Sequence, residues 1–266
     1  MVDLTSRSMR SIDPHQLQVA RELAHNAIQW LARFANSYVP AEPEHRHVLL
    51  DWRPDRRALV TRPVAHGISL ELRLPDLHLQ FARNGQLEAH VLDIEDHTPA
   101  EVEAWFLIEL LHRDIDRSRF SKHLPYSVPG LLTGDSIEYS PASCMPALAA
   151  LTDWLEQGAA ILANLAPAGA TLQCWPETLQ IGRLLPLEAG QASGQPMLRV
   201  GISAGDGLCP EPFFFVMPDE SGARGQPPHP GTILPASRIL AEPVSPASVT
   251  EFLVAARAAN RNRVLL

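Results

Sequence analysis

Two neighbouring segments decide the fold, CWPETLQIGRLLPLE (174–188) and MLRVGISAGDGLCPEPFFFV (197–216). The first predicts a strand that is interrupted at Pro176, because proline cannot donate a hydrogen bond to a neighbouring strand. The second predicts two strands on either side of the turn SAGDG (203–207). Its apolar residues alternate before the turn, and glycine and aspartate favour turn geometry. The C-terminal half of the chain therefore contributes β-strands.

Strands are also predicted in the N-terminal half. Apolar and polar residues alternate over residues 68–74 and 77–81, and Asn84-Gly85 is a strong signal for a hairpin. Together with the apolar run that begins at His47, these patterns predict about four antiparallel strands. We expect each strand to bury one face and to leave the other in water.

Four amphipathic helices are predicted from apolar residues at helical spacing, over residues 14–38, 98–114, 146–165 and 245–260. Two of them have well-defined starts. Asp13-Pro14 provides an N-cap and a first helical residue, and Thr98 with Glu101 has the spacing of a capping box. The predicted class is α+β, with antiparallel strands in both halves and about four helices covering their faces.

A single domain over residues 1–266 is the simplest organisation for a chain of this length. Residues 116–145 are irregular, however, and are punctuated by proline and glycine. A connection of this length is often functional or crosses the surface between two parts of a fold. The alternative is therefore a pair of lobes, 13–115 and 146–262, on either side of this connection.

Composition argues against several classes of function. The chain has 266 residues and a net charge of −8, which argues against nucleic-acid binding because phosphate neutralisation requires clustered Lys and Arg. No apolar run is long enough to span a membrane, and the N-terminus lacks the apolar stretch of a signal peptide. The three cysteines are an odd number and widely spaced, as in proteins that keep reduced thiols. We expect a soluble, cytoplasmic protein of bacterial type with no membrane partner.

Carboxylates in segments 174–188 and 197–216 are the candidate metal ligands. Glu177, Asp206 and Glu211 can supply the oxygen ligands that Mg²⁺ or Ca²⁺ accepts, so the predicted cofactor is either none or one divalent cation. Two of these acids also have a structural explanation, because Asp206 suits a turn and Glu211 precedes a proline that fixes the start of a strand. An adjoining pocket for a small molecule is predicted from aromatic residues, although phenylalanines are more often core residues. The predicted lining residues are Tyr139, Trp175, Phe213 and Phe215.

The same region resembles an uncharacterised family of bacterial proteins, a domain of unknown function, with the pattern WPHHFDIA, then GxSxGD, then EPYFYV. This chain has WPETLQIG (175–182), GISAGD (201–206) and EPFFFV (211–216). The family pattern implies that two histidines and an aspartate can join the downstream acids. Glu177, Thr178 and Gln180 replace those three residues here. The resemblance therefore implies a degenerate metal site, and it implies no activity, since none is established for the family.

Two further motifs have simple interpretations. His45 and His47 would share a face if they lay on a strand. A metal site needs three or four ligands and no third one adjoins them, so a polar start of a strand is favoured. Gly201 to Gly205 matches GxSxG, a serine-hydrolase motif in which a helix follows the serine. Gly207 and Pro210 disfavour a helix there, which argues against that class.

The sequence contains no complete catalytic set of residues. The favoured function is a non-catalytic binding or structural role, with a small molecule as the candidate ligand. The alternative is a hydrolase-like enzyme that uses a divalent cation held by carboxylates near residues 175–216. Whether the protein is an enzyme stays open, and the sequence indicates no oligomeric state.

Overall fold

The computed structural model describes residues 12–165, 171–186, 197–219, 232–241 and 246–264, which form two compact units. The N-terminal unit comprises Ile12–Thr152 together with Cys174–Leu179. The C-terminal unit comprises the described residues of Asp153–Gln173 and Gln180–Leu266. The irregular connection over residues 116–145 belongs to the N-terminal unit, and the boundary between the units falls inside a helix, between Thr152 and Asp153.

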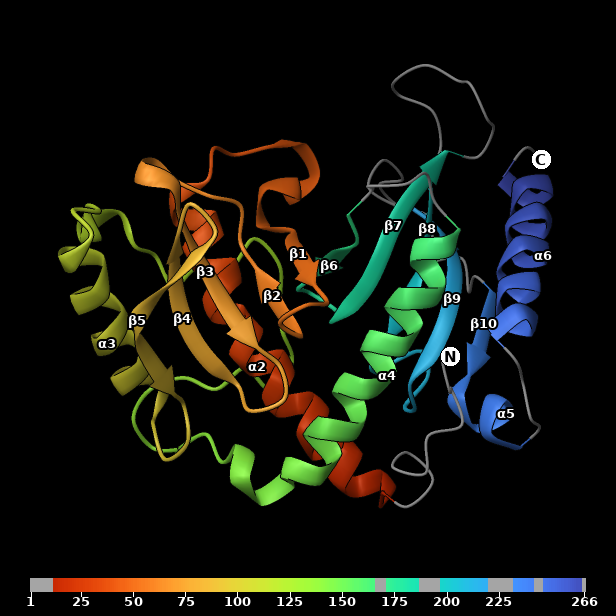
Figure 1. Ribbon diagram of the computed structural model, residues 1–266, viewed down its shortest axis with the longest axis horizontal. Coiled ribbons are helices and arrows are strands. Elements are labelled where there is room, and N and C mark those ends of the chain that lie inside the picture. Colours follow the sequence, from red (N-terminus) through yellow and green to blue (C-terminus); the bar gives the residue numbers. More distant parts are fainter. Residues whose placement is uncertain (1–11, 166–170, 187–196, 220–231, 242–245, 265–266) are drawn as a thin grey trace. The chain divides into compact units, whose positions relative to one another are not determined.

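Four helices of the described chain occupy the predicted positions, and the class is α+β as expected (Figure 1). They are α2 (Pro14–Tyr38), α3 (Pro99–His112), α4 (Met145–Asn164) and α6 (Pro246–Val264). Both predicted caps are present. The side chain of Asp13 accepts a hydrogen bond from the backbone N–H of His15 at 3.1 Å. Thr98 and Glu101 form the reciprocal bonds of a capping box, at 3.3 and 2.8 Å.

Five consecutive antiparallel strands make up most of the N-terminal unit's sheet, where the sequence predicted about four. The first begins later than predicted, because residues 43–48 form a 3₁₀ helix in place of a strand start. In the sheet, β1 lies beside the short strand β6, and β5 lies at the opposite edge. The strands are β1 (Leu50–Arg53), β2 (Ala58–Val60), β3 (Ile68–Arg73), β4 (His78–Arg83), β5 (Gln86–Asp93) and β6 (Gln173–Trp175).

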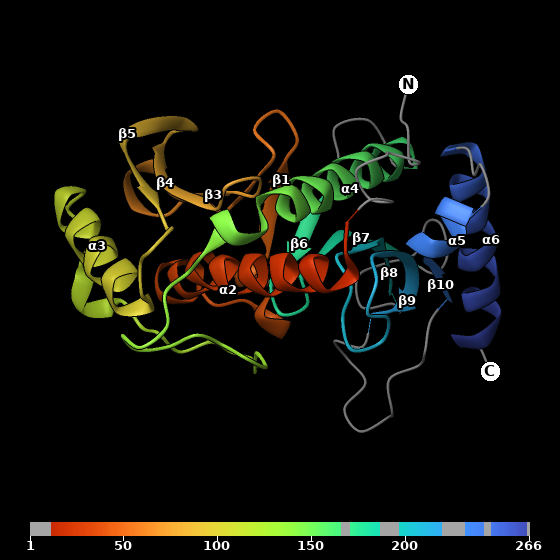
Figure 2. The same cartoon turned by 90° about the horizontal axis from the view of Figure 1, so that it is seen from below.

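The two faces of this sheet differ sharply in character. On one face, the Phe81 ring contacts Phe34 of α2 and Phe106 of α3, with centroids 5.8 and 5.4 Å apart. Figure 2 shows both helices on the same side of β3 and β4. On the other face, Glu71 lies opposite Gln80, which in turn lies opposite Val91 of β5. Side chains directly opposite each other on antiparallel strands share a face, so this row extends across three strands.

An antiparallel four-stranded arrangement organises the C-terminal unit, in the order β10-β9-β8-β7. Its strands are β7 (Gln180–Pro186), β8 (Met197–Ser203), β9 (Phe213–Pro218) and β10 (Thr232–Pro235), and a short helix, α5 (Ala236–Ala241), follows β10. Gly158 of α4 packs closely on these strands, since a Cβ there would lie 2.7 Å from the side chain of Ile202. Trp154, one turn earlier, packs against Phe214 with ring centroids 5.4 Å apart.

Pro176 has a stronger effect than the sequence predicted. The expected single strand, bulged or at an edge, is two strands, β6 and β7, because residues 176–179 form a turn. The backbone N–H of Thr178 bonds the carbonyl of Trp175 at 3.3 Å, and Leu179 adopts a left-handed conformation with φ of 52°. The proline thus ends the strand instead of bending it.

Candidate functional site

Asp206 is held by protein donors on both of its carboxylate oxygens. Oδ1 accepts hydrogen bonds from the backbone N–H groups of Leu208 at 2.9 Å and Cys209 at 3.3 Å. Oδ2 accepts one from Nε2 of Gln180 at 3.0 Å. These bonds fix the turn that follows β8, as expected of aspartate in a turn. Gln180 occupies the position of an aspartate in the family pattern that the sequence resembles, and in this chain it is a hydrogen-bond donor to Asp206.

Glu211 makes a similar structural contribution to the C-terminal unit. Its Oε2 accepts the backbone N–H of Ser237, and its Oε1 accepts the Ser237 hydroxyl, both at 2.7 Å. These two bonds tie Glu211, two residues before β9, to the start of α5. A cation bound by Asp206 and Glu211 would therefore have to compete with five donor groups of the protein, and the predicted carboxylate site stays a prediction.

Glu177 belongs to the N-terminal unit, where the turn that contains it is anchored to α2. Nε2 of His25 lies 3.0 Å from the carbonyl oxygen of Pro176 and 3.1 Å from that of Glu177. The side chain of Gln29 donates to the same Pro176 oxygen at 2.9 Å. Burial lowers the pKa of His25, which favours the neutral ring. The Trp-Pro segment of the motif thus acts as a packed structural turn.

The four aromatic residues predicted to line a pocket are all buried. Phe213 and Phe215 pack in a small cluster with Cys209, their ring centroids 6.1 Å apart. Tyr139 is 1% exposed and its hydroxyl accepts a hydrogen bond from Nε1 of Trp30 at 3.1 Å. Trp175 is 5% exposed. Their positions match the core interpretation that the sequence also allowed, and the predicted pocket stays a prediction.

Of the remaining two motifs, the histidine pair does not start a strand as predicted, whereas the GxSxG segment is followed by no helix, as expected. His45 and His47 lie on the 3₁₀ helix and not on a strand. His47 is buried, with Nε2 3.1 Å from Oδ1 of Asn36. Ser203 ends β8, and the residues that follow it up to β9 form no helix, so the nucleophile-elbow geometry is absent from this described segment.

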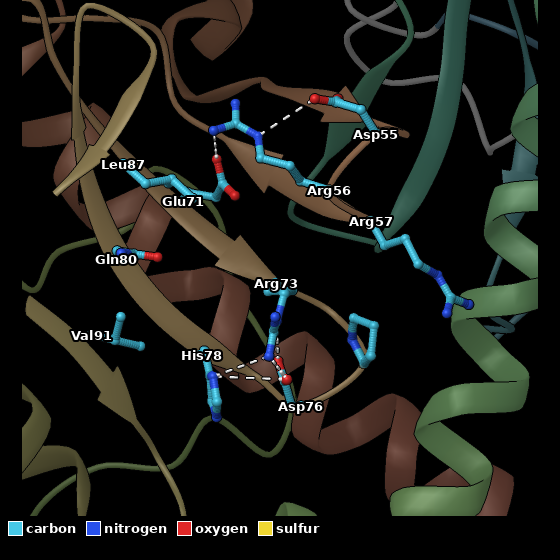
Figure 3. Close-up of a pocket in the computed structure, with 11 residues that line it drawn as sticks. Asp55, Arg56, Arg57, Glu71, Arg73, Asp76, His78, Gln80, Leu87 and Val91 are labelled. Atoms are coloured by element: carbon cyan, nitrogen blue, oxygen red, sulfur yellow. Dashed lines mark hydrogen bonds and ion pairs between the residues drawn. The ribbon is translucent and has the colours of Figure 1, made fainter. Parts of the chain in front are cut away.

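A hollow of about 570 Å³ lies on the sheet face of the N-terminal unit that carries Glu71 (Figure 3). It is lined by residues of the β1–β2 and β3–β4 connections and of β3, β4 and β5. Three arginines and three acids line it, together with the apolar residues Pro75, Leu87 and Val91. The polar lining residues are Asp55, Arg56, Arg57, Glu71, Arg73, Asp76, His78 and Gln80.

Glu71 is the central group of this hollow. It is 4% exposed, and its Oε2 accepts no hydrogen bond from any residue that the structure describes. Nη1 of Arg56 lies 3.1 Å from that oxygen, but the contact is an ion pair without an aligned N–H bond. Burial raises the pKa of the Glu71 carboxyl, and the charge of Arg56 only partly opposes that rise. The group is therefore a buried acid with an unmet need for a donor.

Arg56 is also incompletely engaged. Besides the Glu71 contact, its Nε lies 3.8 Å from Oδ2 of Asp55, too far for a hydrogen bond, and within the described part of the chain this Nε has no hydrogen-bond partner. Figure 3 shows its guanidinium between the two carboxylates. Arg73, in contrast, forms a bidentate ion pair with Asp76, in which Nε donates to Oδ1 at 2.8 Å and Nη2 donates to Oδ2. Arg56 and Glu71 are thus an adjacent donor and acceptor with spare capacity.

The sequence pattern did not point to this pair. In ISLELR (68–73), alternation predicts that Glu71 faces water, where a carboxylate needs no explanation. Arg56 sits in a turn, which is an ordinary place for an arginine. Only the fold shows that the turn covers the glutamate and removes it from solvent.

Comparison of the chain with protein-family models, with curated proteins and with solved structures gave no match. Among the described helices, none combines the length and the apolar character needed to cross a membrane.

Proposed function

We propose that the N-terminal unit binds a small zwitterionic molecule, of the class of an amino acid with an apolar side chain, in the hollow of Figure 3. The observation that carries this proposal is the buried Glu71 oxygen, to which no described residue donates a hydrogen bond, with Arg56 beside it. An ammonium group would supply the missing donor to Glu71. A carboxylate would accept from Arg56 in a charge-assisted hydrogen bond.

Charge balance supports a ligand with both signs. The lining has equal numbers of arginines and acids, so a purely anionic or purely cationic ligand would gain little from the hollow as a whole. A zwitterion has no net charge, yet it can engage Arg56 and Glu71 at the same time. The chain's net charge of −8 similarly supports the expectation that nucleic acid is not the partner.

The volume of the hollow and its exposed apolar residues indicate the size and the side chain of the ligand. A volume of about 570 Å³ is within the range of small-molecule sites. Leu87 and Val91 are 43% and 45% exposed, although both are apolar residues of a strand. A branched aliphatic side chain lying on them would remove apolar surface from water, which stabilises a complex by about 25 cal/mol per Å².

The test compares three ligands that differ by one charged group: leucine, isoamylamine (leucine without its carboxylate) and isocaproate (leucine without its ammonium). Isothermal titration at mildly alkaline pH should give the highest affinity for leucine. Arg56→Gln should weaken the binding of leucine and isocaproate by about tenfold or more, the value of a lost charged hydrogen bond. It should not weaken the binding of isoamylamine, because Glu71 then loses a competing cation. Glu71→Gln should weaken leucine and isoamylamine and spare isocaproate.

Arg117→Gln is the matched control, because Arg117 is exposed on a 3₁₀ helix and does not line the hollow. It removes the same charge and should leave all three affinities unchanged. Equal losses in Arg56→Gln and Arg117→Gln, or no saturable binding of leucine to the unmodified protein, would contradict the proposal.

A binding role agrees with the favoured interpretation of the sequence, and a cytoplasmic location is part of the same proposal. All three cysteines, Cys144, Cys174 and Cys209, are free and buried, which supports a reducing compartment. The bacterial origin stays an expectation from the sequence. The alternative enzyme, with a divalent cation held by Glu177, Asp206 and Glu211, gains no support from the partners of Asp206 and Glu211 and stays a prediction.

A further inference from the structure

Two histidines and a glutamate converge between the edge strand β5 and helix α3 of the N-terminal unit. Oε1 of Glu109 lies 3.1 Å from Nδ1 of His90 and 3.5 Å from Nδ1 of His112. Among the described residues this is the one group of three or more His, Cys, Asp or Glu whose ligand atoms all lie within 4.8 Å of one another. We propose that these three residues bind a divalent transition-metal ion of the zinc class.

The backbone explains why the three side chains meet. Glu109 and His112 are three residues apart on α3, which places them on one face of the helix. On β5 the register shifts between the pairs Gln80–Val91 and Ala82–Leu87. There β4 contributes one residue and β5 contributes three, of which His90 is the last before Val91. Bulges of this kind redirect side chains next to functional sites, and this one sends His90 to the helix.

The two separations from Glu109 suit a tetrahedral ion. Zinc–ligand bonds of about 2.0–2.1 Å in a tetrahedron separate neighbouring ligand atoms by about 3.3 Å. The two separations from Glu109 Oε1, 3.1 and 3.5 Å, lie on either side of that value. Two imidazoles and one carboxylate are also a ligand set that zinc takes in proteins, with the fourth position left for water or another ligand.

Glu109 is oriented before any ion arrives. It is 3% exposed, and its Oε2 accepts a hydrogen bond from Nη1 of Arg113 at 2.6 Å, which leaves Oε1 facing the histidines. Nη2 of Arg113 pairs with Glu88 at 2.5 Å. The guanidinium charge is therefore shared by two carboxylates, which limits its repulsion of a cation. Partners that orient a ligand in this way are typical of metal sites.

The approach to the site is open. The side chains of His90 and His112 are 64% and 53% exposed, and both line a surface hollow of about 530 Å³. An ion can therefore reach the two nitrogens without opening the fold. This site is separate in composition from the hollow of the proposed function, since none of its three ligands lines that hollow.

The experiment is titration of the purified, metal-free protein with Zn²⁺ alone, followed by Co²⁺ as a spectroscopic probe. We expect one Zn²⁺ per chain and an intense visible Co²⁺ spectrum of tetrahedral type that Zn²⁺ removes. His90→Ala and His112→Ala should each weaken Zn²⁺ binding by at least about tenfold. Mg²⁺ should not compete, because it favours oxygen ligands in octahedral geometry.

His123→Ala is the matched control, since His123 is exposed and outside the cluster. The two exposed ligand variants should melt at the temperature of the unmodified metal-free protein, which separates lost binding from lost folding. Zn²⁺ affinity that is unchanged in His90→Ala and His112→Ala, or that falls equally in His123→Ala, would overturn the proposal. So would an absence of saturable binding. Leucine binding is measured without metal, so either proposal can fail alone.

Discussion

The acids of the two units are used in opposite ways. In the C-terminal unit, Asp206 and Glu211 belong to the motif-like segment, yet protein donors occupy both oxygens of each. In the N-terminal unit, Glu71 and Glu109 belong to no motif. Oε2 of Glu71, a residue that lines a hollow, accepts no hydrogen bond from the described residues, and Oε1 of Glu109 faces two exposed histidines.

This difference shows what a carboxylate needs before it can be a candidate ligand group. An acid whose lone pairs are filled by backbone and side-chain donors stabilises its own turn or cap. A buried acid with one oxygen that accepts no hydrogen bond is stabilised when a ligand from solution donates a hydrogen bond to that oxygen. Asp206 illustrates the first case and Glu71 the second.

The largest expected effect is on stability, at Asp206. Asp206→Ala removes the acceptor of three hydrogen bonds and leaves Gln180 without its partner. We expect a loss of about 2–3 kcal/mol in the free energy of unfolding, measured by urea denaturation. Asp206→Asn keeps one oxygen for the backbone donors and should lose less. An unchanged midpoint together with a loss of metal or ligand binding would reverse the comparison.

Glu211 should show a smaller effect of the same kind. Glu211→Ala leaves the backbone N–H and the hydroxyl of Ser237 without their acceptor. Loss of such a cap costs about 1 kcal/mol. Ser237→Ala removes only the hydroxyl bond and is the matched, milder variant. If Glu211→Ala denatures like the unmodified protein while Mg²⁺ or Ca²⁺ binding disappears, Glu211 belongs among the ligands of that cation and the structural interpretation is wrong.

The smallest effect concerns the pH dependence at Glu71. The pKa of Glu71 is raised in the folded state, mainly by burial. Its contribution to the free energy of unfolding is therefore fully present below the ordinary pKa of 4.5. That contribution is lost as the pH rises through the raised pKa of the folded state. Glu71→Gln does not titrate, so the stability of the unmodified protein relative to this variant should fall with rising pH. Urea denaturation from acidic to neutral pH measures the difference. A constant or widening advantage of the unmodified protein would contradict the pKa direction.

Ligand binding should depend on pH in the opposite sense. An ammonium group needs the ionised form of Glu71, so the affinity for isoamylamine should rise as pH increases above 4.5. In Glu71→Gln the affinity should be flat over the same range. Titration calorimetry at several pH values checks this, and a parallel rise in both proteins would assign the effect to another group.

Local patterns predicted much of the fold. The caps at Asp13 and Thr98 formed as their residue types require, and the alternation in 197–203 gave β8. Other features depended on distant contacts. From the sequence alone, Gly158 is expected to lower the stability of its helix by about 1 kcal/mol relative to alanine. Only the packing of Ile202 against it explains why a residue without a side chain is needed there.

The candidate site was much less accessible to sequence reasoning. Apolar Leu87 and Val91 predict a buried face of β5, but both are exposed and line the hollow. The side chain of His90 owes its position to a register shift between β4 and β5, which the neighbouring residues in the sequence do not predict. Unmet hydrogen-bonding capacity is a property of three-dimensional surroundings, so no spacing of residues could have singled out Glu71 or Arg56.

Chemical-shift mapping of leucine on the isotopically labelled intact chain tests the central claim most directly. The account predicts that the backbone amides of Arg56, Glu71 and Gln80 shift on titration, and that those near Asp206 and Glu211 stay in place. Shifts concentrated around Asp206, Glu211 and Glu177, with none at Arg56 or Glu71, would contradict it.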